Sequence, residues 1–125
     1  MIGIDIVKIE RFEKFIEKYD KKGLEKFLDK DEIALVKTAS NVAGFFAAKE
    51  AVSKALKTGI SKECSFKDIK IHKNSNNAPY FTLSKNIIEK LQIKETSLSI
   101  THDGGFAIAV AVIISSLQQT TKISH

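Results

Sequence analysis

The chain has 125 residues, of which 43% are hydrophobic, with one cysteine, one proline and a formal net charge of +5. This length suits a single domain, which we expect over residues 1–114 ahead of a polar tail at 115–125. A lone cysteine excludes an internal disulfide, and the longest apolar run, 106–114, is shorter than the roughly 20 residues of a membrane helix. The amino terminus has Asp5 in its apolar stretch and no basic segment before it, so we do not expect it to act as a signal peptide. We therefore expect a cytoplasmic protein that does not bind membranes.

The excess of positive charge indicates an anionic partner, such as a phosphorylated small molecule, an acidic protein or nucleic acid. Arg11 is the only arginine. Because arginine is the side chain that most often reads bases and phosphates through paired hydrogen bonds, its scarcity weakens the case for nucleic acid. The sequence also lacks the interleaved basic and aromatic residues of a nucleic-acid-binding module.

The first predicted element is a strand over residues 2–9, where apolar side chains alternate with a period of two. One face carries three isoleucines and the other carries Gly3, Asp5 and Val7. From Glu10 the period changes to that of an amphipathic helix ending near Gly23. Two short helical pieces, 24–28 and 32–37, are expected around a polar turn.

The strongest helix signal covers residues 42–57. Asn41 or Ser40 offers an N-cap, no proline interrupts the segment, and Gly59 lies just past its end. Its apolar residues form a wide arc on one side of the helix: Val42, Phe45, Ala48, Val52, Ala55 and Leu56.

The second half of the chain predicts strands at 66–73 and 80–83, a short helix from Ser84 to Leu91, and a hairpin of 97–101 with 106–114. The last arm is apolar on both faces, which is typical of a central strand. The order of elements indicates an α+β fold: a single domain with a mostly antiparallel sheet packed on one long helix and shorter helices.

Several side chains are candidates for chemistry, each with a plainer alternative. Asp5 lies in an apolar strand, where it is either a hydrogen-bonded structural carboxylate or a metal-binding or catalytic group. Glu50 and Lys54 share a helix face at i,i+4, as an ordinary pair worth about 0.3–0.5 kcal/mol or as a site for a cation and an anion. Lys49 points into the apolar arc, where it either extends its stem outward or meets a phosphate or carboxylate. His102, at the hairpin turn, is a simple turn residue or a group that binds phosphate or moves a proton.

Three segments carry a joint pattern. Gly3 to Arg11 reads G-x-D-[IL]-x-x-[IL]-x-R, Phe46 to Ala55 reads F-[AS]-x-K-E-A-x-x-K-A, and Ser99 to Ala109 reads S-[IL]-[ST]-H-x-x-x-[YF]-A-x-A. In this order they resemble the holo-[acyl-carrier-protein] synthase family, the small trimeric class of 4′-phosphopantetheinyl transferases. The likeness extends over nearly the whole chain, to about residue 114.

The resemblance implies transfer of the phosphopantetheine arm of coenzyme A to a serine hydroxyl of acyl carrier protein, a step of fatty acid biosynthesis that releases adenosine 3′,5′-bisphosphate. It implies a homotrimer with active sites at subunit interfaces. By the same resemblance, Asp5 and Glu50 would hold Mg²⁺ against the pyrophosphate, and Lys54 would neutralise it and protonate the leaving group. The proton acceptor for the serine is Glu50 or a metal-bound water.

Further residues match family positions at partner surfaces. Those at or near the coenzyme A site are Lys49, Ser53, Lys54, Gly59 and His102. Arg11 matches a position that contacts the acidic helix of the carrier protein.

The sequence also departs from the family at three places. Phe45 stands where many members have arginine, which removes one basic contact to coenzyme A or carrier protein and leaves a lysine to replace it. The loops around Lys57 and Asn77 lack a glycine that the family has. The alternatives to an active enzyme are a small basic module that binds nucleic acid and an inactive relative with a structural role; the intact set of Asp5, Glu50 and Lys54 argues against the second.

Overall fold

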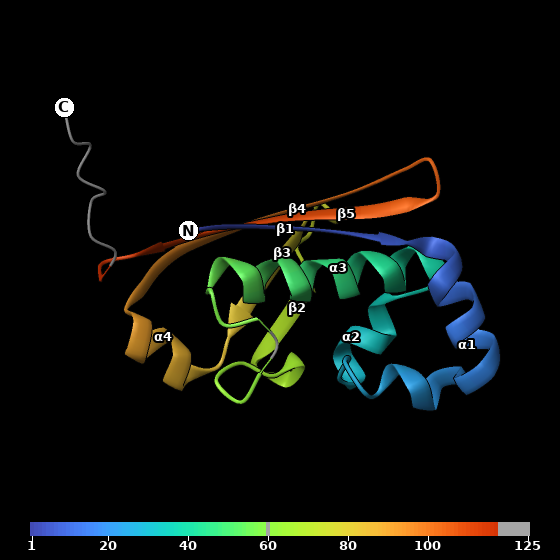
Figure 1. Ribbon diagram of the computed structural model, residues 1–125, viewed down its shortest axis with the longest axis horizontal. Coiled ribbons are helices and arrows are strands. Elements are labelled where there is room, and N and C mark those ends of the chain that lie inside the picture. Colours follow the sequence, from blue (N-terminus) through green and yellow to red (C-terminus); the bar gives the residue numbers. More distant parts are fainter. Residues whose placement is uncertain (60, 118–125) are drawn as a thin grey trace.

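The computed structural model describes residues 1–59 and 61–117. Strand β1 comes first, three helices follow it, and the rest of the chain forms two strand pairs with a short helix between them (Figure 1). In order they are β1 (Ile2–Lys8), α1 (Ile9–Leu24), α2 (Lys30–Leu35), α3 (Ala39–Ala55), a 3₁₀ turn (Phe66–Asp68), β2 (Ile69–Lys73), β3 (Pro79–Leu83), α4 (Lys85–Leu91), β4 (Ile93–Asp103) and β5 (Phe106–Ser115). The architecture is α+β, as predicted.

The main sheet has the strand order β1–β5–β4, and both pairings are antiparallel. The central position of β5 confirms the prediction from its two apolar faces. Helix α3 runs across the inner face of this sheet (Figure 1). The inner residues of β5 include Ala107, Ala109 and Ala111, and Ala51 of the helix is also fully buried. Because alanine side chains are short, strand and helix approach closely.

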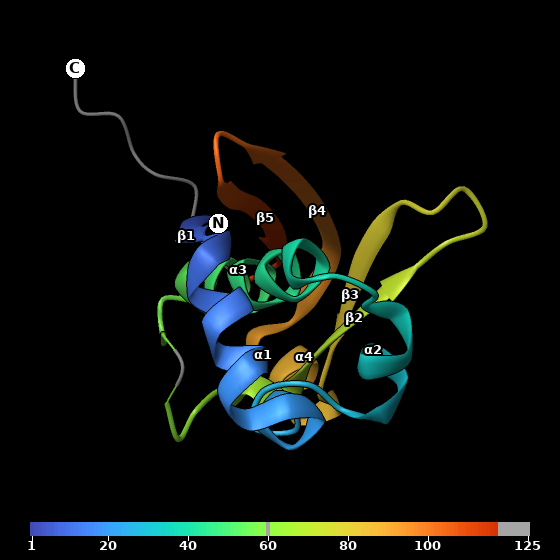
Figure 2. The same ribbon diagram turned by 90° about the vertical axis from the view of Figure 1, so that its right-hand side faces the viewer.

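The remaining elements pack against the other sides of α3. Strands β2 and β3 form a separate antiparallel hairpin whose tip projects from the body (Figure 2). Helix α1 contributes Phe12 to a cluster of aromatic rings around Phe46 of α3, with ring centroids 5.1 Å apart. Phe27 and Phe66 complete this cluster, 5.4 and 5.7 Å from the Phe46 ring. The rings fill the space between α1, α3 and the loops that precede α2 and β2.

Several predicted boundaries need correction. The N-cap of α3 is Thr38, not Ser40 or Asn41, because Asn41 is the N3 residue of a capping box with Thr38. Residues 25–27 form a turn, where we expected a helical piece, and α2 begins at Lys30 under an Asp29 cap. The predicted strand at 66–73 begins with the 3₁₀ turn. Ser115 still belongs to β5, and positions 118–125 of the expected tail lie outside the described residues.

The outer face of the main sheet is apolar and open to solvent. Ile2, Ile4 and Ile6 of β1 are 72%, 59% and 57% exposed, whereas Gly3 and Val7, which point to the opposite face, are buried under α3. The outward isoleucines lie beside outward valine and isoleucine residues of β5. No helix among the described residues is long and apolar enough to cross a membrane.

Candidate active site

Strand β1 and helix α3 cross in backbone contact. A Cβ atom placed on Gly3 would lie only 1.8 Å from the carbonyl oxygen of Ala51, so no larger residue fits there without moving one of the two elements. Asp5 follows Gly3 on the same face of the strand. The crossing therefore brings Asp5 to the segment of α3 that carries Glu50 and Lys54.

Asp5 and Lys54 form an ion pair across this crossing. The Lys54 ammonium lies 2.8 Å from Oδ1 of Asp5 and also donates to the Ile4 carbonyl oxygen at 3.3 Å. The side chain of Asp5 is 12% exposed and that of Lys54 is 52% exposed. The second carboxylate oxygen, Oδ2, is buried and has no hydrogen-bond partner among the described residues. Such an oxygen is costly unless a further group binds it.

Glu50 completes the cluster one helical turn before Lys54. Burial raises the pKa of Glu50 and the negative charge of Asp5 raises it further, while Lys54 and Arg11 lower it. The two carboxylates are thus close enough for their charges to repel each other. Arg11 is stacked on the aromatic cluster, with its guanidinium 5.1 Å from the Phe46 ring centroid.

The donor set fits a hard divalent cation. Mg²⁺ in proteins is bound through one or two carboxylates, and waters and substrate phosphates complete its octahedral shell. The free Oδ2 of Asp5, together with the Glu50 carboxylate whose pKa the charge of Asp5 raises, meets that requirement. Among residues 1–59 and 61–117, no group of three or more histidine, cysteine or acidic side chains forms a metal site, so Asp5 and Glu50 would provide at most two protein ligands. The site therefore suits a cation that a phosphate-bearing substrate helps to bind.

His102 lies in a different part of the chain from this cluster. It belongs to β4, on the far side of β5 from Asp5, and its Nε2 lies 2.9 Å from the carbonyl oxygen of Ser40 at the start of α3. It lines a cavity of about 150 Å³ together with Phe45 and Lys73. The candidate residues of the three sequence segments thus fall into two regions. Asp5, Glu50 and Lys54 lie along the second half of α3, and His102 lies near its start.

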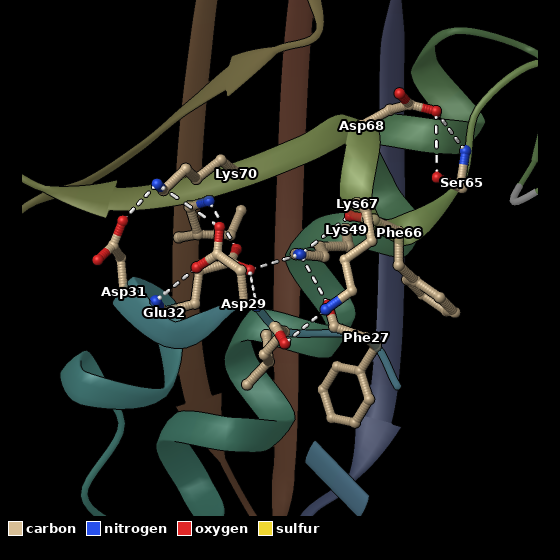
Figure 3. A network of polar contacts seen from close by, with 12 residues as sticks. Phe27, Asp29, Asp31, Glu32, Lys49, Ser65, Phe66, Lys67, Asp68 and Lys70 are labelled. Carbon is tan, nitrogen blue, oxygen red and sulfur yellow. Dashed lines mark hydrogen bonds and ion pairs between the residues drawn. The ribbon is translucent and has the colours of Figure 1, made fainter. Parts of the chain in front are cut away.

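Lys49 does not lie at the surface where we expected a coenzyme contact. Its ammonium is fully buried and donates to Glu32 Oε1 at 2.8 Å and to the carbonyl oxygens of Phe27 and Phe66 at 2.7 and 3.0 Å (Figure 3). Burial lowers the pKa of Lys49, and the ion pair with Glu32 opposes that shift. Because all three N–H donors of the ammonium are used, none remains for a phosphate. The carboxylate alternative is the one that the structure bears out.

Glu32 is the residue that sequence reasoning missed. Its side chain is 1% exposed, and besides Lys49 it accepts hydrogen bonds from the backbone N–H groups of Asp29 and Ile71. The Asp29-x-x-Glu32 spacing is the signature of a capping box, which the sequence displays. That spacing predicts the helix cap, but it does not indicate that Glu32 also forms an ion pair with Lys49 of α3.

Ser53 and Gly59 lie around the end of α3. The Ser53 side chain is buried and its hydroxyl donates to the Glu50 carbonyl oxygen at 2.7 Å. Gly59 has a positive φ of 61°, and so does Lys57, at 64°, where the family pattern has glycine. The loop thus keeps a left-handed turn at Lys57 without the glycine that favours it.

Comparisons with known proteins agree on one family. Residues 1–111 match the family model described as the 4′-phosphopantetheinyl transferase superfamily. The chain is 58% identical over 114 residues to the holo-[acyl-carrier-protein] synthase of a Nitratiruptor species, covering 91% of this chain and 98% of the relative. It is 56% identical over 117 residues to the synthase of Helicobacter pylori strain 26695, covering 93% and 98% of the two chains.

Solved structures show the same likeness. The crystal structure of the Helicobacter pylori holo-[acyl-carrier-protein] synthase in complex with coenzyme A superimposes with a TM-score of 0.88 at 55% identity, over 91% of this chain and all of that one. The synthase of Bacillus anthracis gives a TM-score of 0.77 at 38% identity, over 92% and 96% of the two chains. The chain therefore belongs to the 4′-phosphopantetheinyl transferase superfamily and is an enzyme of the holo-[acyl-carrier-protein] synthase type.

Proposed function

We propose that this enzyme transfers the 4′-phosphopantetheine group of coenzyme A to a serine hydroxyl of apo acyl carrier protein, with Mg²⁺ as cofactor. The serine oxygen forms a bond to the phosphorus that bears the pantetheine arm, and the bond from that phosphorus to the bridging pyrophosphate oxygen breaks. The products are holo carrier protein, used in fatty acid biosynthesis, and adenosine 3′,5′-bisphosphate. The observation that carries the proposal is the cluster of Asp5, Glu50 and Lys54 at the crossing of β1 and α3.

Asp5 and Glu50 are the residues that would hold the metal. The unpartnered Oδ2 of Asp5 supports this assignment, as does the repulsion between the charges of the two carboxylates. Bound there, Mg²⁺ would supply positive charge to the pyrophosphate oxygens. The relatives named above support coenzyme A as the donor, because one of them is described in complex with it.

The chain's own groups would handle the protons. Glu50, whose pKa is raised by burial, is our candidate for the group that accepts the serine proton, directly or through a water. Lys54 would neutralise the pyrophosphate and donate a proton to the leaving phosphate oxygen. Its half-exposed ammonium on a long flexible stem can reach a substrate outside the crossing.

The remaining coenzyme contacts would come from the two ends of α3. Gly59 and the backbone around Ser53 would line the site beyond Lys54, and His102 would contact a peripheral phosphate at the helix start. Lys73 shares the His102 cavity and has no ion-pair partner among the described residues, so it is our candidate to replace the arginine that Phe45 displaces. Ser53 would contribute only its backbone atoms to this contact, because its hydroxyl donates a hydrogen bond to the backbone carbonyl oxygen of Glu50.

We also propose a cytoplasmic homotrimer whose subunits meet through the outer face of the main sheet. The support is the exposure of Ile2, Ile4 and Ile6, since monomers rarely leave so continuous an apolar surface in water. An interface there would lie directly behind the strand that carries Asp5. Arg11, exposed on the first turn of α1, is our candidate contact for the acidic carrier protein.

The transfer is tested by incubating the protein with coenzyme A, Mg²⁺ and apo acyl carrier protein and then weighing the carrier by mass spectrometry. We expect a mass increase of one phosphopantetheine group, abolished by a chelator. An unmodified carrier, in a reaction where a known synthase modifies the same preparation, would contradict the proposal.

The trimer is tested separately by light scattering. Ile4→Lys, on the outer face, should lower the molecular mass to that of one subunit, whereas Ile88→Lys, a matched change on exposed helix α4, should not. A monomeric parent protein at micromolar concentration would contradict the assembly without affecting the transfer.

A further inference from the structure

An ammonium group, that of Lys54, is bound by the same carboxylate that the proposed metal site needs. Lys54 donates to Asp5 Oδ1 and to the Ile4 carbonyl oxygen, both on β1. It makes no ion pair with Glu50, although Glu50 lies one turn away on its own helix and such pairs are common there. The Lys54 side chain thus extends from α3 to β1, and its ammonium neutralises the carboxylate of Asp5.

We propose that Lys54 holds the place of the metal in the coenzyme-free enzyme, and that a divalent cation displaces it and thereby releases it toward the substrate. This inference rests on the proposed function, because it assumes that Asp5 and Glu50 bind the cation. It adds a coupling between two events: occupation of the carboxylates and the availability of the Lys54 ammonium.

The burial of the two partners decides which one moves. Asp5 is 12% exposed and fixed to a strand, whereas Lys54 is 52% exposed and has four methylene groups between its charge and its backbone. An ion pair that is half open to water contributes little to stability, so the lysine leaves at small cost. The carboxylate stays in place and is available to either cation.

The free oxygen of Asp5 provides the point of entry. Oδ2 is buried and unpartnered among the described residues while Oδ1 is bound to Lys54, so a cation can bind the carboxylate before the lysine departs. Once it has bound, the two positive charges repel each other across a few ångströms, and the attraction between Lys54 and Asp5 falls. By thermodynamic reciprocity, Lys54 must weaken metal binding by the same factor by which the metal weakens the ion pair.

The test is metal binding by the coenzyme-free protein, followed with Mn²⁺ as a paramagnetic probe. Lys54→Met keeps the length of the stem and removes the charge, so we expect it to bind Mn²⁺ tighter by about two- to fivefold, the range that corresponds to one exposed ion pair. Lys57→Met is the matched control. It removes one charge just beyond the same helix end, from an exposed residue that forms no ion pair among residues 1–59 and 61–117, and should change the affinity less. Asp5→Asn should lose binding.

Three outcomes overturn the inference. Weaker binding by Lys54→Met means that the lysine organises the metal ligand instead of competing for it. An equal gain in both lysine variants means that only overall charge matters. Absence of binding by both the parent protein and Lys54→Met removes the exchange altogether.

A second experiment uses the parent protein alone. Amine acetylation read by mass spectrometry should label Lys54 faster when Mg²⁺ is present, while the labelling rate of Lys57 stays constant. An unchanged or slower rate at Lys54 contradicts displacement. If the parent protein transfers phosphopantetheine but these tests fail, only the exchange is wrong; if it transfers nothing, the proposed function is wrong.

Discussion

Helix α3 carries two lysine–carboxylate pairs with the same 2.8 Å contact and opposite surroundings. The pair of Lys49 and Glu32 is buried, and the ammonium and both carboxylate oxygens are all hydrogen-bonded (Figure 3). The pair of Lys54 and Asp5 is partly open, and one carboxylate oxygen has no partner among the described residues. The contact distance therefore says nothing about the role of a pair. The two pairs differ in whether a polar atom remains free to bind another group. The pair of Lys54 and Asp5 has such an atom, and the pair of Lys49 and Glu32 does not.

The buried pair also connects α3 to the elements around it. Lys49 joins it to the loops around Phe27 and Phe66, and Glu32 extends the connection to β2 through the Ile71 N–H group. Every charge in this network is matched, which is the condition for burying it. Lys54 of the open pair lies about one and a half turns further along the same helix. Its distance from Asp5 therefore depends on how α3 is positioned.

The largest expected effect comes from breaking the buried pair. Lys49→Met should cost about 3–5 kcal/mol of unfolding free energy, because it leaves the Glu32 carboxylate buried without a counter-charge. Urea denaturation measures the loss. The double variant with Glu32→Gln removes the uncompensated charge and should recover part of the stability. A single variant as stable as the parent would show that the network contributes no more than a surface pair.

The second effect concerns activity instead of stability. Asp5→Asn should reduce transfer to acyl carrier protein by about 100-fold or more, since it removes charge stabilisation at the reacting phosphate. Its urea midpoint should stay close to that of the parent, because the amide keeps the shape of the side chain and an oxygen for Lys54. Initial rates at saturating coenzyme A and Mg²⁺ provide the measurement. Activity within a few-fold of the parent would exclude Asp5 from the proposed metal site.

The smallest effect is a gain in stability at neutral pH. The folded-state pKa of Glu50 is raised above its ordinary 4.5, so at higher pH its charge destabilises the folded form. Glu50→Gln should therefore raise the unfolding free energy at pH 7 by a few tenths of a kcal/mol, an amount about as small as solvent screening allows. The gain should shrink as the pH falls through the folded pKa and should disappear below 4.5, where Glu50 becomes protonated in both states. Thermal melts at several pH values test this, and a gain that persists at pH 4 would contradict the assignment.

Periodicity and capping signals predicted most of the fold. The alternation in β1, the apolar arc of α3 and the two apolar faces of β5 each depend on local spacing, and all three are confirmed. The misplaced boundaries occur where two polar residues compete to cap a helix, as Thr38 and Asn41 do, and where a turn is as polar as a helix start. Local sequence does not rank such alternatives, because tertiary contacts decide between them.

The sequence predicted which residues form the candidate site, but it did not predict which neighbouring residues contact them. The motif brings Asp5, Glu50 and Lys54 together, and the structure places them at one crossing. The burial of Lys49 depends on Glu32, which is 17 residues away in the chain, and no local pattern couples them. For the same reason the sequence does not reveal that His102 lies at the opposite end of α3 from Glu50.

Gly3 sets the distance between β1 and α3 at the candidate site, and no side chain lies between the two elements there. Its missing Cβ lets the β1 backbone touch the Ala51 carbonyl, so the spacing between the two carboxylate-bearing elements is set by main-chain atoms. Changes in the surrounding core can then accumulate without widening that gap. The width of the proposed metal site is therefore a property of the polypeptide backbone, and a larger residue at position 3 would widen it.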